Sequence, residues 1–161
     1  MKEKKIIITG GLGFLGFSIF KKLINENYIL VIDNLSSNIT KKKFITNNKN
    51  GSFYELNITS NSMMEIFEQY NPEIVIHCAA QTNVIESMKN PIKTKKINIE
   101  GTRNILESVK NLSNCYFVFI SSGGAIYGEP KYLPVDENHE KNPISNYGIS
   151  KLKGELLTKN I

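Results

Sequence analysis

The fold is decided by one stretch near the N-terminus, which reads Ile6-Ile7-Ile8-Thr9-Gly10-Gly11-Leu12-Gly13-Phe14-Leu15-Gly16. The three isoleucines form a β-branched run without polar alternation, which is typical of a strand buried on both faces. The glycines that follow fit the pattern G-x-G-x-x-G, and apolar residues then recur at helical spacing through 14–25. A strand, a glycine turn and a helix in this order predict the first unit of a dinucleotide-binding fold.

The glycines suit the binding of a pyrophosphate. A glycine permits a tight turn and lets the backbone approach the phosphates without a Cβ in the way, and the helix N-terminus offers free N–H groups and a partial positive charge. Asp33 ends the second apolar run, where its carboxylate is suited to both hydroxyls of an adenine ribose and would repel the 2′-phosphate of NADP. The pattern therefore favours NAD, and a glycine-rich turn without a ligand is the alternative.

Apolar runs alternate with amphipathic segments along the rest of the chain. We expect strands at 28–32, 53–56, 74–76 and 116–120, helices at 62–69 and 95–110, and a final helix that Ser145 caps and that extends to Lys159. The segments 34–51 and 128–143 are expected to be loops. This alternation predicts an α/β fold, a doubly wound Rossmann-type parallel sheet of order 3-2-1-4-5. Its ligand crevice is expected at the carboxyl ends of strands 1 and 4.

Length and composition limit the alternatives. The chain has 161 residues, 40% of them hydrophobic, which predicts one domain with a real core over 1–161. The formal net charge is +5, but Arg103 is the only arginine and the lysines are scattered apart from 41–43 and 95–96, so we expect no nucleic-acid partner. Two cysteines and no long apolar run argue against a disulfide framework and a membrane span. We expect a cytoplasmic protein, since the glycines interrupt the signal-like N-terminus and no cleavage site follows it.

A second motif lies near the C-terminus, where the chain reads Tyr147-Gly148-Ile149-Ser150-Lys151. A helix would carry Tyr147 and Lys151 on one face, because residues four apart are neighbours. A nearby ammonium favours the phenolate form that a tyrosine base needs. The spacing of Tyr147 and Lys151 alone is common by chance, and an ordinary surface pair is the alternative. The upstream glycine pattern favours the catalytic interpretation.

Taken together, these segments resemble the extended short-chain dehydrogenase/reductases, the NAD-dependent epimerase/dehydratase family. The matching segments are Thr9-Gly10-Gly11-Leu12-Gly13-Phe14-Leu15-Gly16, Asp33-Asn34-Leu35-Ser36-Ser37, His77-Cys78-Ala79-Ala80-Gln81, Asn98-Ile99-Glu100-Gly101-Thr102, Ser121-Ser122-Gly123-Gly124-Ala125-Ile126-Tyr127-Gly128 and the Tyr147 motif. Members of this family run to about twice this length. The resemblance therefore implies a C-terminally truncated chain that lacks the substrate domain.

The resemblance also implies roles for particular residues. Tyr147 would be the catalytic base, Lys151 would bind the nicotinamide ribose, and Ser122 would supply a hydroxyl to the reacting sugar oxygen. The cofactor would be NAD, and its contacts would come from Gly10, Gly11, Gly13, Phe14, Leu15, Gly16, Asp33, Asn34, Asn57, Ile58, Ala79, Ala80, Gln81, Asn98, Ser121, Tyr147 and Lys151. No metal is expected.

The family's catalytic Ser or Thr stands where this chain has Gly123, so Ser122, a water or the backbone would have to take over its hydrogen bond. His77 is expected to be structural, because no second His or Cys lies at ligand spacing. Cys78 and Cys115 are expected to be buried strand residues.

The resemblance implies 4-epimerisation of UDP-glucose and UDP-galactose through a 4-keto intermediate, with a UDP-hexose as substrate. Three alternatives stay open: another NAD-dependent nucleotide-sugar enzyme (dehydratase, decarboxylase or reductase), a non-catalytic NAD-binding module, and a dimerisation module. The segment Ser122-Gly123-Gly124 argues against dehydration, because dehydratases of the family usually carry Thr-Asp-Glu there. The helices at 95–110 and 145–159 match the pair that forms a homodimer in the family.

Overall fold

The computed structural model describes residues 2–36 and 40–159, and Ser37 of the second family motif lies outside this range. The chain divides into two compact units. Unit 1 comprises 1–80 and 104–120, and unit 2 comprises 81–103 and 121–161. Each unit is described by itself below.

Unit 1 is built on a parallel five-stranded sheet. Its strands are β1 (Lys5–Thr9), β2 (Tyr28–Asp33), β3 (Gly51–Glu55), β4 (Ile74–His77) and β5 (Tyr116–Phe119), in the order β3-β2-β1-β4-β5. Ile7 pairs with Leu30 on one side and with Val75 on the other, which places β1 at the centre. The predicted strand order is therefore confirmed.

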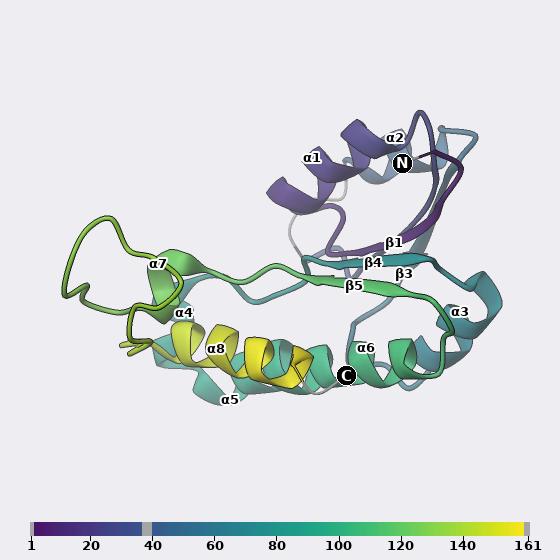
Figure 1. The fold of residues 1–161 in the computed structure, drawn as a ribbon. Coiled ribbons are helices and arrows are strands. Elements are labelled where there is room, and N and C mark those ends of the chain that lie inside the picture. Colours follow the sequence, from purple (N-terminus) through teal and green to yellow (C-terminus); the bar gives the residue numbers. More distant parts are fainter. Residues whose placement is uncertain (1, 37–39, 160–161) are drawn as a thin grey trace. The chain divides into compact units, whose positions relative to one another are not determined.

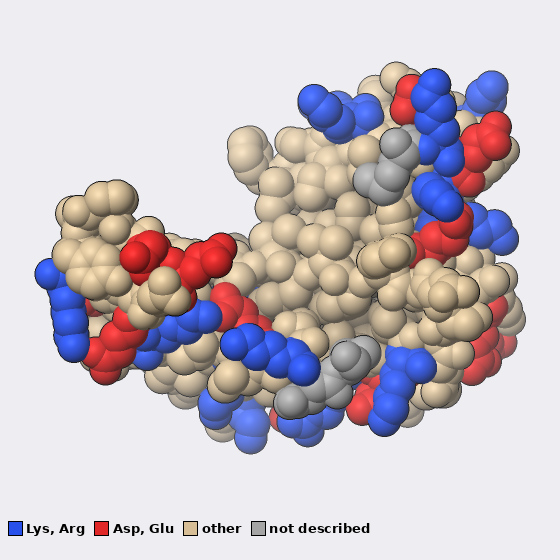
Figure 2. All heavy atoms as spheres, in the orientation of Figure 1, with Lys and Arg blue, Asp and Glu red and all other residues tan. Residues whose placement is uncertain are grey.

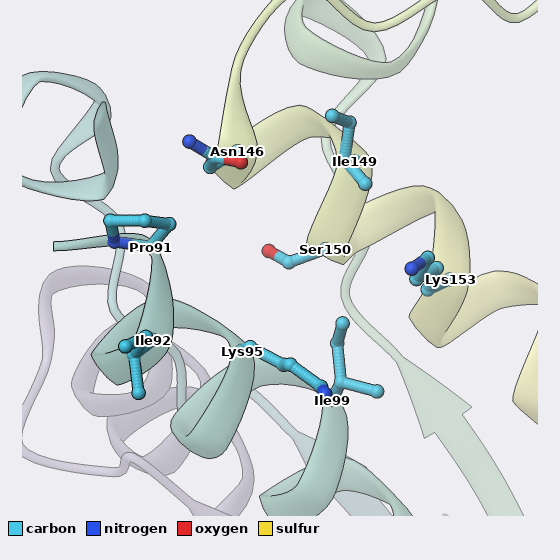
Figure 3. A pocket seen from close by; sticks show the side chains of 8 residues that line it. All are labelled: Pro91, Ile92, Lys95, Ile99, Asn146, Ile149, Ser150 and Lys153. Carbon is cyan, nitrogen blue, oxygen red and sulfur yellow. The ribbon is translucent and has the colours of Figure 1, made fainter.

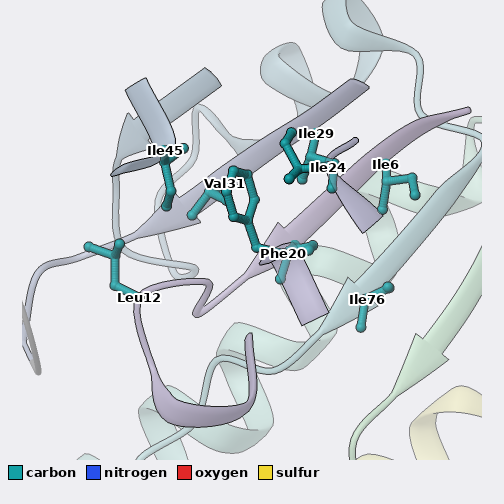
Figure 4. Packing of buried hydrophobic residues seen from close by; sticks show 9 residues of the cluster. Ile6, Leu12, Phe20, Ile24, Ile29, Val31, Ile45 and Ile76 are labelled. Carbon is teal, nitrogen blue, oxygen red and sulfur yellow. The ribbon is translucent and has the colours of Figure 1, made fainter. Parts of the chain in front are cut away.

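Helices cover both faces of this sheet (Figure 1). They are α1 (Phe14–Leu23) and α2 (Lys42–Thr46) on one face, and α3 (Met63–Tyr70) and the end of α6 (Thr102–Lys110) on the other. Helix α2 lies within the segment that we predicted as a loop, and its five residues are too few to show a period. Buried isoleucines, together with Phe20 and Leu12, fill the space between α1, α2 and the sheet (Figure 4). Full burial of one such side chain contributes about 1.5–3 kcal/mol.

Burial differs between the central strand and an edge strand of the sheet. Ile6, Ile7 and Ile8 of β1 are completely buried. The edge strand β5 alternates between exposed and half-buried residues, and Tyr116 keeps 77% of its surface exposed. The two cysteines correct our expectation, because both are half-buried and flank strands instead of lying in them: Cys78 follows β4 and Cys115 precedes β5.

Unit 2 is helical. It contains α4 (Val84–Lys89), α5 (Pro91–Lys95), the π-helix η1 (Lys96–Gly101), the short α7 (Gly123–Ile126) and α8 (Asn146–Thr158). The predicted helix at 95–110 is confirmed, but the helical segment begins earlier, at Pro91. It contains a π-helical turn, which the spacing of its apolar residues did not predict. Ser145 caps α8 as predicted, since its side chain accepts a hydrogen bond from the Gly148 N–H at 3.0 Å.

The surface agrees with a dispersed distribution of charge. Figure 2 shows that the Lys and Arg side chains on this face lie at several separate places instead of forming one patch. Among the described residues, no helix combines the length and the apolar character that a membrane span requires. The same residues contain no group of three or more His, Cys, Asp or Glu side chains arranged to hold a metal ion.

Candidate functional site

The glycine turn of unit 1 brings the ends of β1 and β4 into close contact. Gly10 has a φ of +67°, and a Cβ on it would lie 2.7 Å from the backbone of Ala79, which follows β4. A Cβ on Gly16 would collide with the Gly10 carbonyl, and one on Gly13 would lie 3.1 Å from the same oxygen. Only glycine permits this turn, which lies at the switch point of the sheet, where ligands of such folds bind.

The N-terminus of α1 is suited to an anion. Its N-cap, Gly13, has no side chain with which to satisfy the first amides, and the first turn carries no acidic residue. Phe14, the first helical residue, keeps 90% of its surface exposed. Free amides and the helix dipole together favour a phosphate group at such an end.

Asp33, at the end of β2, braces the glycine turn. Its side chain is 6% exposed, its Oδ2 accepts from the Leu12 N–H at 3.0 Å, and its Oδ1 accepts from the Leu35 N–H at 2.9 Å. A carboxylate offers about four acceptor positions, so two remain for the hydroxyls of a ribose. Asn34 beside it is exposed, and its side-chain oxygen accepts from the Ser36 N–H.

The segment after β3 holds the next two candidates. Ile58 is buried, whereas Asn57 is exposed and its carbonyl oxygen already accepts two hydrogen bonds from Thr59. An adenine amino group would therefore have to compete with Thr59 for this oxygen. Asn104, which sequence reasoning missed, holds this segment by donating to the carbonyls of Ile58 and Ser60 at 2.7 and 2.8 Å.

His77 is structural, as its surroundings show. It is 1% exposed, and its Nδ1 lies 2.6 Å from the Thr9 hydroxyl, which also accepts from the Ala79 N–H. The imidazole tautomer decides whether Nδ1 or the hydroxyl donates, since both groups can donate and accept. Thr9, to which the sequence pattern assigned no separate role, thus ties the end of β1 to the segment that begins with Ala79.

In unit 2, Asn98 occupies the π-helical turn and is 2% exposed. Its side chain accepts from the Gln81 N–H at 2.7 Å and donates both to the Gln81 carbonyl and to the Ser150 hydroxyl at 2.9 Å. Ser150 in turn donates to the Tyr147 carbonyl. One side chain thus joins Gln81 to α8, and π-helical turns are frequent at functional sites.

Gln81 carries an unsatisfied group. Its side-chain nitrogen donates to the Asn83 carbonyl, but its Oε1 is the one buried side-chain polar atom without a hydrogen-bond partner in the part of the chain that the structure describes. An unpaired buried acceptor costs about 1–3 kcal/mol, and a ligand hydroxyl would satisfy it.

Helix α8 carries the tyrosine and the lysine. Tyr147 is half-buried and its N–H donates to the Ser87 hydroxyl at 3.1 Å, while Lys151 is 5% exposed. Gly148 packs so closely on the Ala125 carbonyl that a Cβ would collide with it. The first turn of α8 is therefore fixed by contacts on several sides.

The serines before α7 differ from each other. Ser121 donates to Glu155 of α8 at 2.6 Å, whereas the Ser122 side chain makes no capping hydrogen bond, although Ser122 is the N-cap of α7. A Cβ on Gly123 would meet nothing within 4 Å. The space around Gly123 would therefore accept a hydroxyl-bearing side chain.

Comparison with known proteins gives a consistent result. The family model described as GDP-mannose 4,6 dehydratase matches residues 7–161. A Methanocaldococcus jannaschii protein named "Putative UDP-glucose 4-epimerase" is 46% identical, over 96% of this chain and 50% of its own. The structure of Thermotoga maritima UDP-glucose 4-epimerase with UDP-glucose is 39% identical with a TM-score of 0.88, over 97% of this chain and 50% of that one.

A second similar solved structure contains NAD. Brucella ovis UDP-glucose 4-epimerase in complex with NAD is 33% identical with a TM-score of 0.88, over 98% of this chain and 47% of that one. The chain thus spans about half the length of the curated relatives that it matches.

Proposed function

Because the chain belongs to the NAD-dependent epimerase/dehydratase family of the short-chain dehydrogenase/reductases, we propose that it provides the cofactor site and the catalytic pair of a nucleotide-sugar 4-epimerase. The substrate is a UDP-hexose, in the first place UDP-glucose or UDP-galactose. The observation that carries this proposal is α8, which presents a half-buried Tyr147 and, one turn later, a buried Lys151. Sequence likeness to epimerases supports the reaction class.

The cofactor is NAD, and the described residues fit it. The glycines form a tight turn in which a Cβ on Gly10 or Gly16 would collide with the backbone, the α1 N-terminus suits the pyrophosphate, and Asp33 suits the ribose hydroxyls. Ala79 and Ala80 follow β4 beside Gly10, and Gln81 offers an unsatisfied acceptor. When bound, NAD supplies a reversible acceptor for the hydride of a sugar carbon.

The residues of unit 2 handle the proton. Tyr147 Oη takes it from the sugar 4-hydroxyl and returns it, and Lys151, one turn later on α8, binds the nicotinamide ribose. Ser122, whose hydroxyl caps nothing, takes the hydrogen bond that the family assigns to the position of Gly123. The Asn98 side chain links Gln81 to α8 by hydrogen bonds.

Replacement of Tyr147 tests this assignment. Tyr147→Phe should lower the conversion of UDP-galactose to UDP-glucose by about 10²–10⁴-fold, because it removes the base. NAD should stay bound, measured by extracting the cofactor from the purified protein. An active Tyr147→Phe protein would refute the role of the base, and NAD binding without epimerisation in the wild type would favour a binding module.

A different sugar reaction is the second candidate, since the matching family model is described as a dehydratase. Ser122-Gly123-Gly124 lacks an acidic residue, whereas dehydratases of the family carry one at this place. An assay of the same protein with GDP-mannose separates the two reactions.

We also propose a homodimer through the helices at 95–110 and 145–159. Within unit 2, α5, η1 and α8 surround a cavity of about 220 Å³ (Figure 3), lined by Pro91, Ile92, Lys95, Ile99, Asn146, Ile149, Ser150 and Lys153. Ile92 is 81% exposed beside it, so a second copy would bury apolar surface there. Sedimentation should show a dimer that Ile92→Glu dissociates, and a wild-type monomer would contradict the dimer.

A further inference from the structure

The lysine triplet 41–43 has no place in the function argued so far. In the structure its members differ. Lys43 is exposed, and Lys42 pairs with Glu55 at 3.1 Å. Lys41 is half-buried, and its ammonium donates to the Leu12 carbonyl at 3.0 Å and approaches the Gly13 carbonyl at 3.5 Å.

Lys41 is also held by an aromatic ring. Its Nζ lies 5.1 Å from the centre of the Phe17 ring, on the first turns of α1. Phe17 contacts Phe44 edge to face at 5.5 Å, and Phe44 lies in α2, which Lys41 precedes as N-cap. The Phe17 ring and the carbonyls of the glycine turn therefore both contact the Lys41 ammonium.

Both backbone polar groups of Leu12 are hydrogen-bonded to charged side chains. Asp33 accepts from its N–H at 3.0 Å, and Lys41 donates to its carbonyl at 3.0 Å. The ammonium offsets the partial negative charge of the carbonyl oxygens of this turn and leaves the neighbouring amides free for an anion. Hydrogen bonds to a charged group are about twice as strong as neutral ones.

We propose that Lys41 is a positioning residue of the cofactor turn: it holds the carbonyls of Leu12 and Gly13 and adds a positive charge beside the amides that bind the pyrophosphate of NAD. This inference rests on the proposed NAD site. It assigns to Lys41 an electrostatic share in cofactor affinity that neither the glycine pattern nor Asp33 provides.

The test compares NAD affinity by titration calorimetry in the purified chain. Lys41→Met keeps the stem over Phe17 and removes the charge, so NAD should bind about tenfold more weakly. Lys41→Arg keeps a cation with donors and should stay within about threefold of the wild type. Lys43→Met is the matched control and should bind as the wild type does, because it removes the same charge from an exposed neighbour.

Ionic strength separates charge from packing. Salt screens charges over about 10 Å at 0.1 M, so the difference between wild type and Lys41→Met should shrink when NaCl rises from about 20 to 200 mM. A salt-independent loss that Lys41→Arg does not restore would overturn the electrostatic role.

The remaining outcomes are also decisive. Equal NAD affinity of Lys41→Met and wild type would overturn the inference and leave the NAD site intact, even if the melting temperature fell. A wild-type chain that melts cooperatively but binds no NAD would refute the proposed function, and this inference with it.

Discussion

The glycine turn of unit 1 depends on its backbone, whereas the candidate side chains of α8 in unit 2 lie on a helix that other side chains hold. The turn at Gly10 admits no Cβ because the chain crosses Ala79 too closely. Tyr147 and Lys151 instead depend on α8, which Asn98 and Ser87 hold by hydrogen bonds. An added side chain should destabilise the glycine turn by steric collision. The placement of α8 should instead be destabilised when a polar partner is removed, so substitutions distinguish the two sites.

The largest effect is expected at Gly10. Gly10→Ala places a Cβ 2.7 Å from the Ala79 backbone in a residue with a φ of +67°. The left-handed conformation costs about 1–2 kcal/mol and the collision about 1–3 kcal/mol more, so urea denaturation should show a loss of about 2–5 kcal/mol. Gly124→Ala is the control from unit 2, where a Cβ meets nothing within 4 Å, and it should leave stability unchanged or slightly raised. Equal losses in both variants would contradict the steric argument.

The next largest effect is expected at Asn98. Asn98→Ala leaves the N–H and carbonyl of Gln81 without their partner, which should cost about 2–4 kcal/mol in urea denaturation. Hydrogen exchange at the Gln81 amide should accelerate, since this N–H donates to the Asn98 side chain. Ser150→Ala removes one of the three bonds of Asn98 and should cost about 1 kcal/mol. If both variants were equally stable, the network would not hold unit 2 in the way described.

The same contrast explains what could be predicted from the sequence. The glycine turn and Asp33 lie within 30 residues of each other, and the turn carries its own steric rule, so the turn and the order of the sheet could be predicted from the sequence. The bond between Asn98 and Ser150 joins residues 52 positions apart, and no periodicity records it. Lys41, Thr9 and Asn104 were missed for the same reason, because a lysine or a threonine carries no signal until its partners are known.

A moderate, pH-dependent effect is expected at Glu155. Burial alone would raise the pKa of this carboxyl, but the hydrogen bonds from Lys141 and Ser121 outweigh burial and lower it below its usual range. The hydrogen bond to Glu155 raises the pKa of Lys141. The hydrogen bonds from Ser121 and from Lys141 to Glu155 each measure 2.6 Å. The Glu155 side chain is 19% exposed and the Lys141 side chain is 30% exposed.

The sign of the pH dependence follows from these directions. A carboxyl with a lowered pKa stabilises the fold above its unfolded value of about 4.3 and loses that contribution as the pH falls through the folded value. The pKa of Lys141 is raised, so the contribution of its ammonium to stability is lost only when the pH rises through the pKa of Lys141 in the folded protein. Glu155→Gln should therefore cost about 1–2 kcal/mol at pH 7, and this difference should shrink at pH 3.5.

Urea denaturation at both pH values provides this measurement. Glu129→Gln is the control, because Glu129 is an exposed acid of the same unit. A difference between Glu155→Gln and wild type that stays constant from pH 7 to pH 3.5 would rule out the ionised pair as its source.

The smallest effect, at Gln81, has the opposite sign for folding and for binding. Gln81→Met removes the buried Oε1 that has no partner, at the expense of an exposed bond to Asn83. Removal of an unsatisfied acceptor should stabilise the chain by up to about 1 kcal/mol, which corresponds to a rise of about 2–4 °C in melting temperature. If that oxygen is kept for a hydroxyl of the cofactor, NAD should bind the variant more weakly despite its higher stability. Calorimetry with NAD and a thermal melt on the same sample decide between the two readings: a variant that gains stability and keeps its NAD affinity would make Gln81 a packing defect of unit 2 and not a part of its site.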